Sequence, residues 1–185
     1  MERTTEWRKS LVKRFPYLTP KNAFTGKVSD TYDYSYVVGE YDLPEGWFEL
    51  FLQMCEDIRR PLEEDNRLNE FRFLQVKEKY GSLRVYTTGA SMEVYDIIDK
   101  YEFLSQQVCS VCGNPATVMT YGYICPYCSD RVRGSMENVD DWELITIKTS
   151  FVKKTHGPNG TVETELDCSE EWERYLKRIG YENGT

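Results

Sequence analysis

Four cysteines are the residues whose type and spacing point most directly to chemistry. They form two Cys-x-x-Cys pairs that are separated by the twelve residues 113–124. Thiolates are preferred zinc ligands, and two tight turns of this spacing can supply the four corners of a tetrahedron. Gly113 follows the first pair, where such a turn often needs a positive φ. The pattern predicts one zinc ion bound by four thiolates, those of Cys109, Cys112, Cys125 and Cys128.

The predicted zinc ion has a structural role. Catalytic zinc keeps one coordination position open for water or substrate, whereas four thiolates fill the tetrahedron. The His-x-Glu pattern that accompanies the cysteines of zinc deaminases does not precede Cys109.

A redox dithiol is the alternative for the second pair. Cys125-Pro-Tyr-Cys128 matches the active-site tetrapeptide of glutaredoxins, in which a helix start lowers the pKa of a thiol. That fold places the motif after the first strand of a βαβ unit, and the residues before Cys125 predict no such unit. Metal ligation is therefore favoured, and zinc content in reducing buffer separates the two hypotheses.

The remaining candidate nucleophiles predict no catalytic centre. Cys55 lies on the apolar side of a predicted helix, as a buried core thiol does. Cys168 ends a predicted strand and could be a free surface thiol. His156, the one histidine, lies at a Gly-rich hairpin tip, a poor place for Ser-His-Asp or Cys-His catalysis. We assign no catalytic residue, and an enzyme is the less favoured class.

A local basic group occurs at the tip of a predicted hairpin. It contains Lys77, Lys79, Tyr80 and Arg84 in a chain whose net charge is −8. These residues could contact an anionic partner, or the lysines could simply keep a sheet edge from pairing with other chains. The contact hypothesis gains support if Arg72 and Arg84 face each other across the hairpin.

A second candidate partner surface is rich in tyrosine. Tyr32, Tyr34 and Tyr36 alternate with polar residues in a predicted loop. Tyrosine in loops is favoured at interfaces because it brings a large contact area at low entropy cost. The alternative is a loop that folds back on the core.

The elements that must position these residues follow from hydrophobic periodicity and turn signals. Helical spacing is found over residues 6–15 and 47–58, after Ser91, and after Ser169, with Pro61 predicted to end the second helix. Strands are predicted in a hairpin over residues 70–88 turning at Gly81, over 142–153, and over 161–166 after a turn at 157–160. A short strand near 34–38 and a helical turn over 129–136 complete the expectation.

This order predicts an α+β fold, with antiparallel β-hairpins, flanking helices and an inserted zinc-ribbon-like pair of Cys knuckles. We expect an α+β core over residues 1–108 and a zinc-ribbon-like module over 109–136. A hairpin and C-terminal helix over 137–185 would pack on the core.

Composition narrows the class of partner. The chain has 185 residues, 14% of them aromatic, which is enough to build a core. Its acidic balance disfavours a protein that coats nucleic-acid phosphates and favours a protein partner. The first nine residues contain no apolar segment, and no run of about 18 apolar residues occurs, so we expect a cytoplasmic protein with no membrane contact.

Three stretches of the middle of the chain resemble a group of small uncharacterised bacterial and bacteriophage proteins. They are residues 46–50 (Gly-Trp-Phe-Glu-Leu) with the following Cys55, residues 75–86 (Gln-Val-Lys-Glu-Lys-Tyr-Gly-Ser-Leu-Arg-Val-Tyr), and residues 109–113 (Cys-Ser-Val-Cys-Gly). The resemblance covers residues 45–130 and implies a prokaryotic or phage protein of the cytoplasm. The group has no established activity, so it carries over no catalytic residue.

We therefore expect a non-enzymatic, zinc-stabilised interaction protein, which would bind or inhibit a host protein if it is phage-encoded. The alternative is a nucleic-acid-binding module with a basic face formed by Lys77, Lys79, Arg84, Arg131 and Arg133. Phosphate contacts weaken steeply as salt rises, so salt dependence separates the two. The sequence does not set an oligomeric state.

Overall fold

The computed structural model describes residues 5–19, 25, 27–28, 43–128, 142–158 and 160–181. The fold is mixed α+β, and its strands form three separate antiparallel sheets. Its elements are α1 (Thr5–Arg14), η1 (Pro16–Leu18), η3 (Glu45–Trp47), α2 (Phe48–Glu64), β1 (Phe73–Lys79), β2 (Ser82–Thr87), α3 (Met92–Ser105), β3 (Val118–Thr120), β4 (Pro126–Tyr127), β5 (Trp142–Leu144), β6 (Ser150–Gly157), β7 (Gly160–Asp167) and α5 (Ser169–Arg178).

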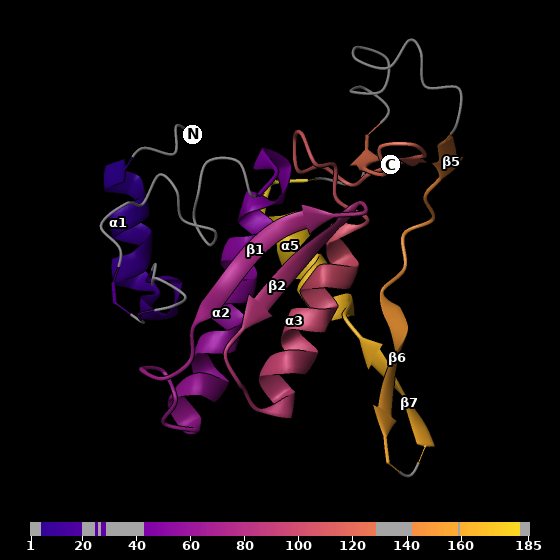
Figure 1. Cartoon of the computed structure of the whole chain (residues 1–185). Coiled ribbons are helices and arrows are strands. Elements are labelled where there is room, and N and C mark those ends of the chain that lie inside the picture. The colour runs from indigo at the N-terminus through magenta and orange to yellow at the C-terminus, as the bar shows by residue number, and fades with distance from the viewer. Residues whose placement is uncertain are drawn as a thin grey trace.

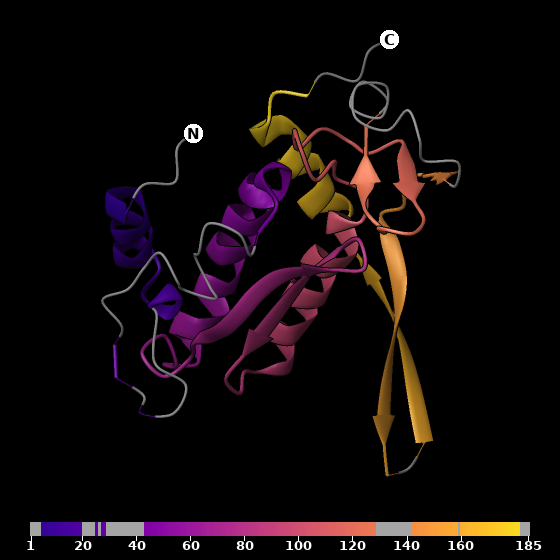
Figure 2. The same cartoon turned by 45° about the horizontal axis from the view of Figure 1, so that its top comes forward.

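The body of the molecule is built on helices α2 and α3. The β1–β2 hairpin lies across one side of this helix pair, and α5 lies on the other side (Figures 1 and 2). Apolar residues recur on α2 at helical spacing and face the core. The largest fully buried side chains come from several elements and are Trp47, Tyr17, Tyr101, Tyr175, Phe15, Phe51 and Phe71. None of the described helices is long and apolar enough to cross a membrane.

The turn of the β1–β2 hairpin confirms the role predicted for Gly81. Tyr80 has a φ of 53° and Gly81 a φ of 75°, and two consecutive positive values allow a two-residue loop that matches the strand twist. A Cβ on Gly81 would lie 3.0 Å from Cγ2 of Ile124 and 3.1 Å from Sδ of Met119. The hairpin tip therefore packs directly against the cysteine-containing segment.

Side chains of α3 close the outer edge of β2. Ser105 Oγ accepts a hydrogen bond from the Leu83 amide at 2.8 Å, and Glu102 Oε1 accepts one from the Val85 amide at 2.8 Å. Glu102 also accepts a bond from Arg84 Nη1 at 2.7 Å. These edge amides are therefore already paired and cannot accept another strand.

The β6–β7 hairpin, residues 150–167, projects from the body as an arm (Figures 1 and 2). Its strands pair in register from Ser150↔Asp167 to Gly157↔Gly160. Among the described residues, the base of the arm is anchored to the body. There Phe151 stacks on Phe103 of α3 with ring centroids 4.6 Å apart.

Two boundary predictions are wrong. Helix α2 runs past Pro61 to Glu64. Proline removes one helical hydrogen bond, but the burial of Pro61 and Leu62 in the core outweighs that loss. The single strand expected over residues 142–153 is two strands, since the Gln107 side chain bonds both backbone groups of Lys148 between them.

The helix starts at Ser91 and Ser169 are only partly as predicted. Ser91 occupies the N-cap position of α3 but makes no side-chain cap bond. Cys168, and not Ser169, occupies the N-cap position of α5, and the Asp167 carboxylate accepts the Ser169 amide at 2.9 Å. The strand expected at 34–38 and the helical turn at 129–136 lie outside the described residues.

Candidate metal centre

The structure brings three of the predicted zinc ligands together. The sulfur atoms of Cys109, Cys112 and Cys128 all lie within 4.8 Å of one another. Cys112 Sγ and Cys128 Sγ, one from each predicted pair, are 3.5 Å apart. The chain thus folds the two Cys-x-x-Cys turns against each other, as the spacing predicts.

The donor set fits a soft or borderline metal ion. Zinc–thiolate bonds are about 2.3 Å long, so two thiolates on one tetrahedral zinc lie roughly 3.8 Å apart. The observed sulfur separations are compatible with that geometry. These three thiolates would hold the metal, which would supply folding energy by joining segments distant in sequence.

Cys125 lies close by but outside this group of three sulfur atoms. Its side chain is buried, and burial raises the pKa of its thiol, which hydrogen bonds with Ser110 and Tyr127 partly offset. Thr120 Oγ1 bonds both the amide and the carbonyl of Cys125 at 3.2 Å, which fixes the backbone of this turn. Cys125 is therefore next to the centre, with its thiol engaged by protein groups.

The turn that carries Cys109 is inserted between the start of α2 and the core. The Gly46 amide donates to the Ser110 carbonyl at 2.9 Å, and Trp47 Nε1 donates to the Val108 carbonyl at 2.8 Å. A Cβ on Gly46 would lie only 2.1 Å from the Cys109 carbonyl oxygen. Glycine is therefore required at position 46 for the turn to dock.

Helix α5 holds the same turn from the opposite side. The buried Tyr175 hydroxyl donates to the Gly113 carbonyl at 2.5 Å. Gly113 has a φ of 83°, in the left-handed region, as predicted for the residue after the first Cys-x-x-Cys pair. The centre thus connects α2, α5 and the cysteine segment. The sulfur atoms of Cys109 and Cys128 belong to buried side chains, which suits a structural role.

The second pair is held by a short sheet. Strand β3 pairs with β4 on one side and with β5 on the other. The Ser110 amide donates to the Pro126 carbonyl at 3.0 Å, which ties the two cysteine turns together. Strands β3 and β4 therefore form a local hairpin, and β5 joins it as a third strand from later in the chain.

The basic residues of the hairpin tip are engaged within the chain. Lys77 Nζ lies 5.2 Å from the ring centroid of Tyr86, and Lys79 Nζ lies 5.4 Å from that of Tyr80. Arg84 is bonded to Glu102. Each of these three cations therefore has an intramolecular partner, and Tyr80 is both exposed and in contact with Lys79.

Arg72 and Arg84 do not face each other across the hairpin, so the contact hypothesis does not gain that support. Arg84 faces Lys77 in the hairpin register, whereas the Arg72 carbonyl accepts a hydrogen bond from the Thr88 amide at 2.9 Å. The turn at residues 80 and 81 sets this register. Three candidate partner contacts and two arginines of the alternative basic face lie outside the described residues: Tyr32, Tyr34 and Tyr36, and Arg131 and Arg133.

Three other singled-out residues have structural surroundings. Cys55 is fully buried, as predicted. Cys168 is also fully buried, so the surface-thiol prediction is wrong; its Sγ lies 3.1 Å from the Thr149 carbonyl oxygen. His156 lies in β6 opposite Thr161, one pair before the hairpin tip, and Nδ1 is 2.8 Å from Oγ1 of Thr161.

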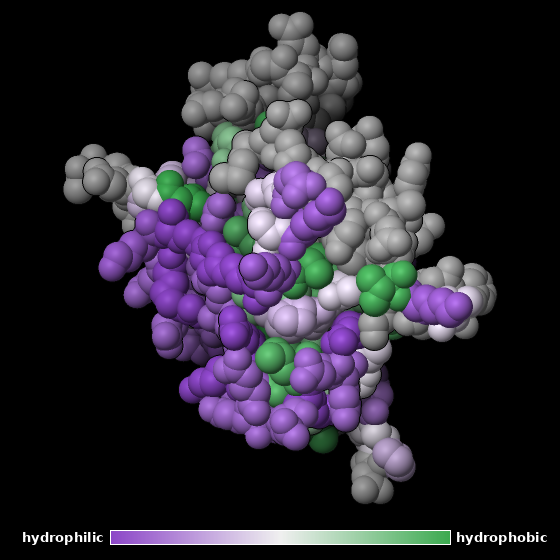
Figure 3. All heavy atoms as spheres, turned by 90° about the vertical axis from the view of Figure 1, so that its left-hand side faces the viewer, coloured by the Kyte–Doolittle hydropathy of each residue, from purple (hydrophilic) through white to green (hydrophobic). Residues whose placement is uncertain are grey.

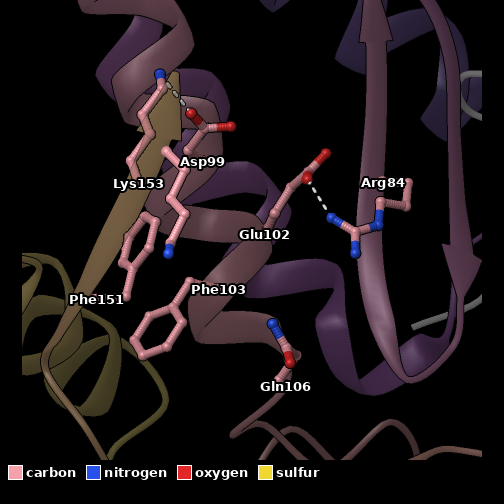
Figure 4. A pocket seen from close by; sticks show the side chains of 8 residues that line it. Arg84, Asp99, Glu102, Phe103, Gln106, Phe151 and Lys153 are labelled. Atoms are coloured by element: carbon pink, nitrogen blue, oxygen red, sulfur yellow. Dashed lines mark hydrogen bonds and ion pairs between the residues drawn. The ribbon is translucent and has the colours of Figure 1, made fainter. Parts of the chain in front are cut away.

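A groove of about 290 Å³ is lined by residues of β2, α3 and the base of the arm. Figure 4 shows its charged side chains: Glu102 turns toward Arg84, and Asp99 turns toward Lys153. Lys153 Nζ is 2.7 Å from Asp96 and 2.6 Å from Asp99. These carboxylates and cations are already paired with one another. The ion pairs of Lys153 fix the base of the arm to α3.

Sequence reasoning missed the residues that receive the cysteine turn. Gly46, Trp47 and Tyr175 each donate a hydrogen bond to a backbone carbonyl of this turn. Residue type alone does not predict such a contact. The available signal is that a Gly-Trp pair precedes α2 in the same chain as a Cys-x-x-Cys-Gly turn.

No protein-family model matches the chain, and no match was found among curated proteins or solved structures.

Proposed function

We propose that this chain is a non-enzymatic interaction protein, stabilised by one structural zinc ion, whose arm contacts a protein partner. The arm is the observation that carries this proposal. Every described residue of β7 except Leu166 is exposed, and so are most of those of β6. A two-stranded hairpin on its own is only marginally stable in water.

The arm is nevertheless held in a defined direction. The Phe103–Phe151 stack and the Lys153 ion pairs fix its base to α3, while the described residues of the outer pairs are exposed. It carries the exposed apolar side chains of Val152 and Val162 outward, with 52% and 64% of their surface accessible. Such an arrangement is suited to contact with another macromolecule.

The side of the molecule on which α1 lies is mostly hydrophilic where the structure describes it. Seen from the α1 side (Figure 3), hydrophilic side chains cover most of the described surface, and hydrophobic ones occur in small separate groups. Scattered apolar residues of this kind are normal for a monomer surface. The proposed contact therefore rests on the exposed valines of the arm.

The zinc part of the proposal rests on the donor set. Cys125, buried beside the three-sulfur group, is proposed as the fourth ligand, which completes a zinc-ribbon-like site. A structural metal is supported by the contacts of its turn with Gly46 and Tyr175. The metal would hold the cysteine segment, from which the chain leads through β5 to the arm.

Affinity purification from a bacterial lysate, with and without nuclease, tests this function. The matched variant replaces residues 154–163 with Asn-Gly, which keeps the Lys153↔Thr164 pair and both anchors of the base. We expect a discrete protein that survives nuclease and is captured by the intact chain and not by the shortened one. Recovery of nucleic acid, or equal capture by both forms, would contradict the proposal.

A further inference from the structure

The outer edge of β7 differs from that of β2. The β2 edge is closed by Ser105 and Glu102, whereas no described hydrogen bond from another element reaches the outer edge of β7. Strand β7 has eight residues, longer than the typical five to six. A long open edge is a template for another strand unless something prevents it.

The register identifies the backbone groups that face outward. A two-residue turn joins Gly157 and Gly160, so this pair and every second pair after it exchange hydrogen bonds within the arm. The Cys168 amide donates to the Thr149 carbonyl at 2.7 Å, which continues the same alternation at the base. The amides and carbonyls of the intervening β7 residues, Thr161, Glu163 and Glu165, therefore point away from β6.

The charge on this edge is acidic. Strand β7 contains Glu163, Glu165 and Asp167 and no lysine or arginine. Lys154 lies 2.8 Å from Glu163, but Glu165 accepts a bond from the neutral Ser150 hydroxyl at 3.0 Å. Negative charge on an edge repels a second acidic strand and attracts a basic one.

A second copy of the chain is a poor occupant. Two-fold pairing of β7 with β7 would place glutamates against glutamates, and like charges directly opposite are destabilising. Pairing of β7 with β6 of another copy is a heterologous contact, which builds rings or open filaments. Lys153 of β6 is also already paired with Asp96 and Asp99 of its own chain. The occupant that fits the edge is an extended segment of a different protein.

We propose that the outer edge of β7 binds a basic, extended segment of a partner protein by strand addition. The partner's backbone pairs with the outward groups of Thr161, Glu163 and Glu165. Its lysines or arginines lie on the face that carries Glu163 and Glu165. This inference rests on the proposed function, because it names the mode and charge of the contact that the arm makes.

Amide hydrogen exchange of the full chain, followed by NMR, tests the inference. The probes are two eight-residue peptides of alternating threonine and charged residues, one with lysine and one with glutamate. The lysine peptide should slow exchange at Thr161, Glu163 and Glu165 and leave the outward amides of β6 unchanged. The glutamate peptide should protect neither edge.

Two variants at one position separate the edge from its charge. Glu163→Pro removes an outward amide without removing a bond inside the arm, and should weaken binding of the lysine peptide at least about tenfold. Glu163→Thr removes the same charge and keeps the amide, so binding should fall only about two- to fivefold. Retained protection of Val162 and Thr164, whose amides face β6, shows that the arm stays folded in both variants.

Three results of the exchange experiment would overturn the inference. They are no protection at millimolar lysine peptide, equal protection by both peptides, and concentration-dependent self-association that protects β7 without peptide. A lysate partner that needs the arm but binds Glu163→Pro as tightly as the intact chain would also overturn it, and the proposed function would stand. Absence of any arm-dependent partner would instead contradict the function, while the peptide result still decides the edge.

Discussion

Gly46 illustrates how the turn that carries Cys109 constrains a single residue far away in the sequence. A Cβ there would lie 2.1 Å from the Cys109 carbonyl oxygen and 2.7 Å from the Gly113 amide nitrogen. Both are backbone atoms, so they cannot move aside cheaply. Gly46→Ala should lower the free energy of unfolding by about 1–3 kcal/mol, as overpacking does, and weaken metal retention.

The matched control for this substitution is Gly89→Ala. A Cβ at Gly89 would lie no closer than 4.0 Å to Nη2 of Arg67, the end of a long side chain. Urea unfolding of both variants should show a lower midpoint for Gly46→Ala only. Equal midpoints would mean that the cysteine turn does not dock on α2 as described.

Cys125 decides whether the centre has three or four thiolates. If it is the fourth ligand, Cys125→Ser should lose zinc in a chelator competition about as readily as Cys112→Ser does. Cys55→Ser, which changes a buried thiol remote from the centre, should keep its zinc. A Cys125→Ser protein with the zinc affinity of the intact chain would establish a three-thiolate site.

Burial makes Cys168 unreactive and couples it to pH. It raises the pKa of this thiol from 9.0 to about 11. Between these values the unfolded chain has released the proton and the folded chain retains it, so stability falls as pH rises from 9 toward 11. Iodoacetamide at pH 8 should label Cys168 slowly in the native protein and quickly in urea, and equal rates would refute the buried position.

At the residue scale, the sequence was sufficient for groups whose own chemistry is distinctive. The spacing of the cysteines predicted that Cys109, Cys112 and Cys128 converge, and Gly113 and Gly81 were predicted from turn chemistry. The burial of Cys168 was not predicted, because it depends on the packing of the arm's base on α3. The steric requirement for glycine at position 46 was not predicted for a similar reason, because it depends on the Cys109 carbonyl group, which is distant in sequence.

At the scale of elements, α3 both supports the β1–β2 hairpin and closes its edge. Ser105 is fully buried and accepts the Leu83 amide at 2.8 Å. Ser105→Ala leaves that amide without a partner and should cost about 1–3 kcal/mol of unfolding free energy. Ser91 provides the control, because its buried Oγ makes no hydrogen bond, so Ser91→Ala should be close to neutral. Thermal unfolding that ranks the two in the opposite order would contradict the edge-closing role.

The types of the elements were more predictable than their limits. Hydrophobic spacing indicated α1, α2, α3 and α5, and the paired turns indicated both long hairpins. The continuation of α2 past Pro61 could not be predicted, because burial of the following turn outweighs the lost hydrogen bond. The break between β5 and β6 comes from Gln107, whose side chain bonds the Lys148 backbone from another part of the fold.

For the whole molecule, the metal centre and the arm are two consequences of one arrangement. The cysteine turns contact the start of α2 at Gly46 and α5 at Tyr175, and β5, which pairs with β3, directly precedes the arm in the chain. The same α3 helix carries Phe103 and Asp99, which fix the base of the arm. Loss of the metal should therefore loosen the cysteine segment while α2, α3 and the β1–β2 hairpin keep their core.

Native mass spectrometry of the full chain, purified in reducing buffer, tests directly whether the cysteine turns bind one zinc ion. We predict a species whose mass equals the chain plus one zinc ion, with the zinc lost when Cys112 is replaced by serine. We also predict that this variant unfolds at a lower temperature than the intact protein. A fully folded, metal-free protein, or a Cys112→Ser variant that keeps both its zinc and its stability, would contradict the proposed zinc site.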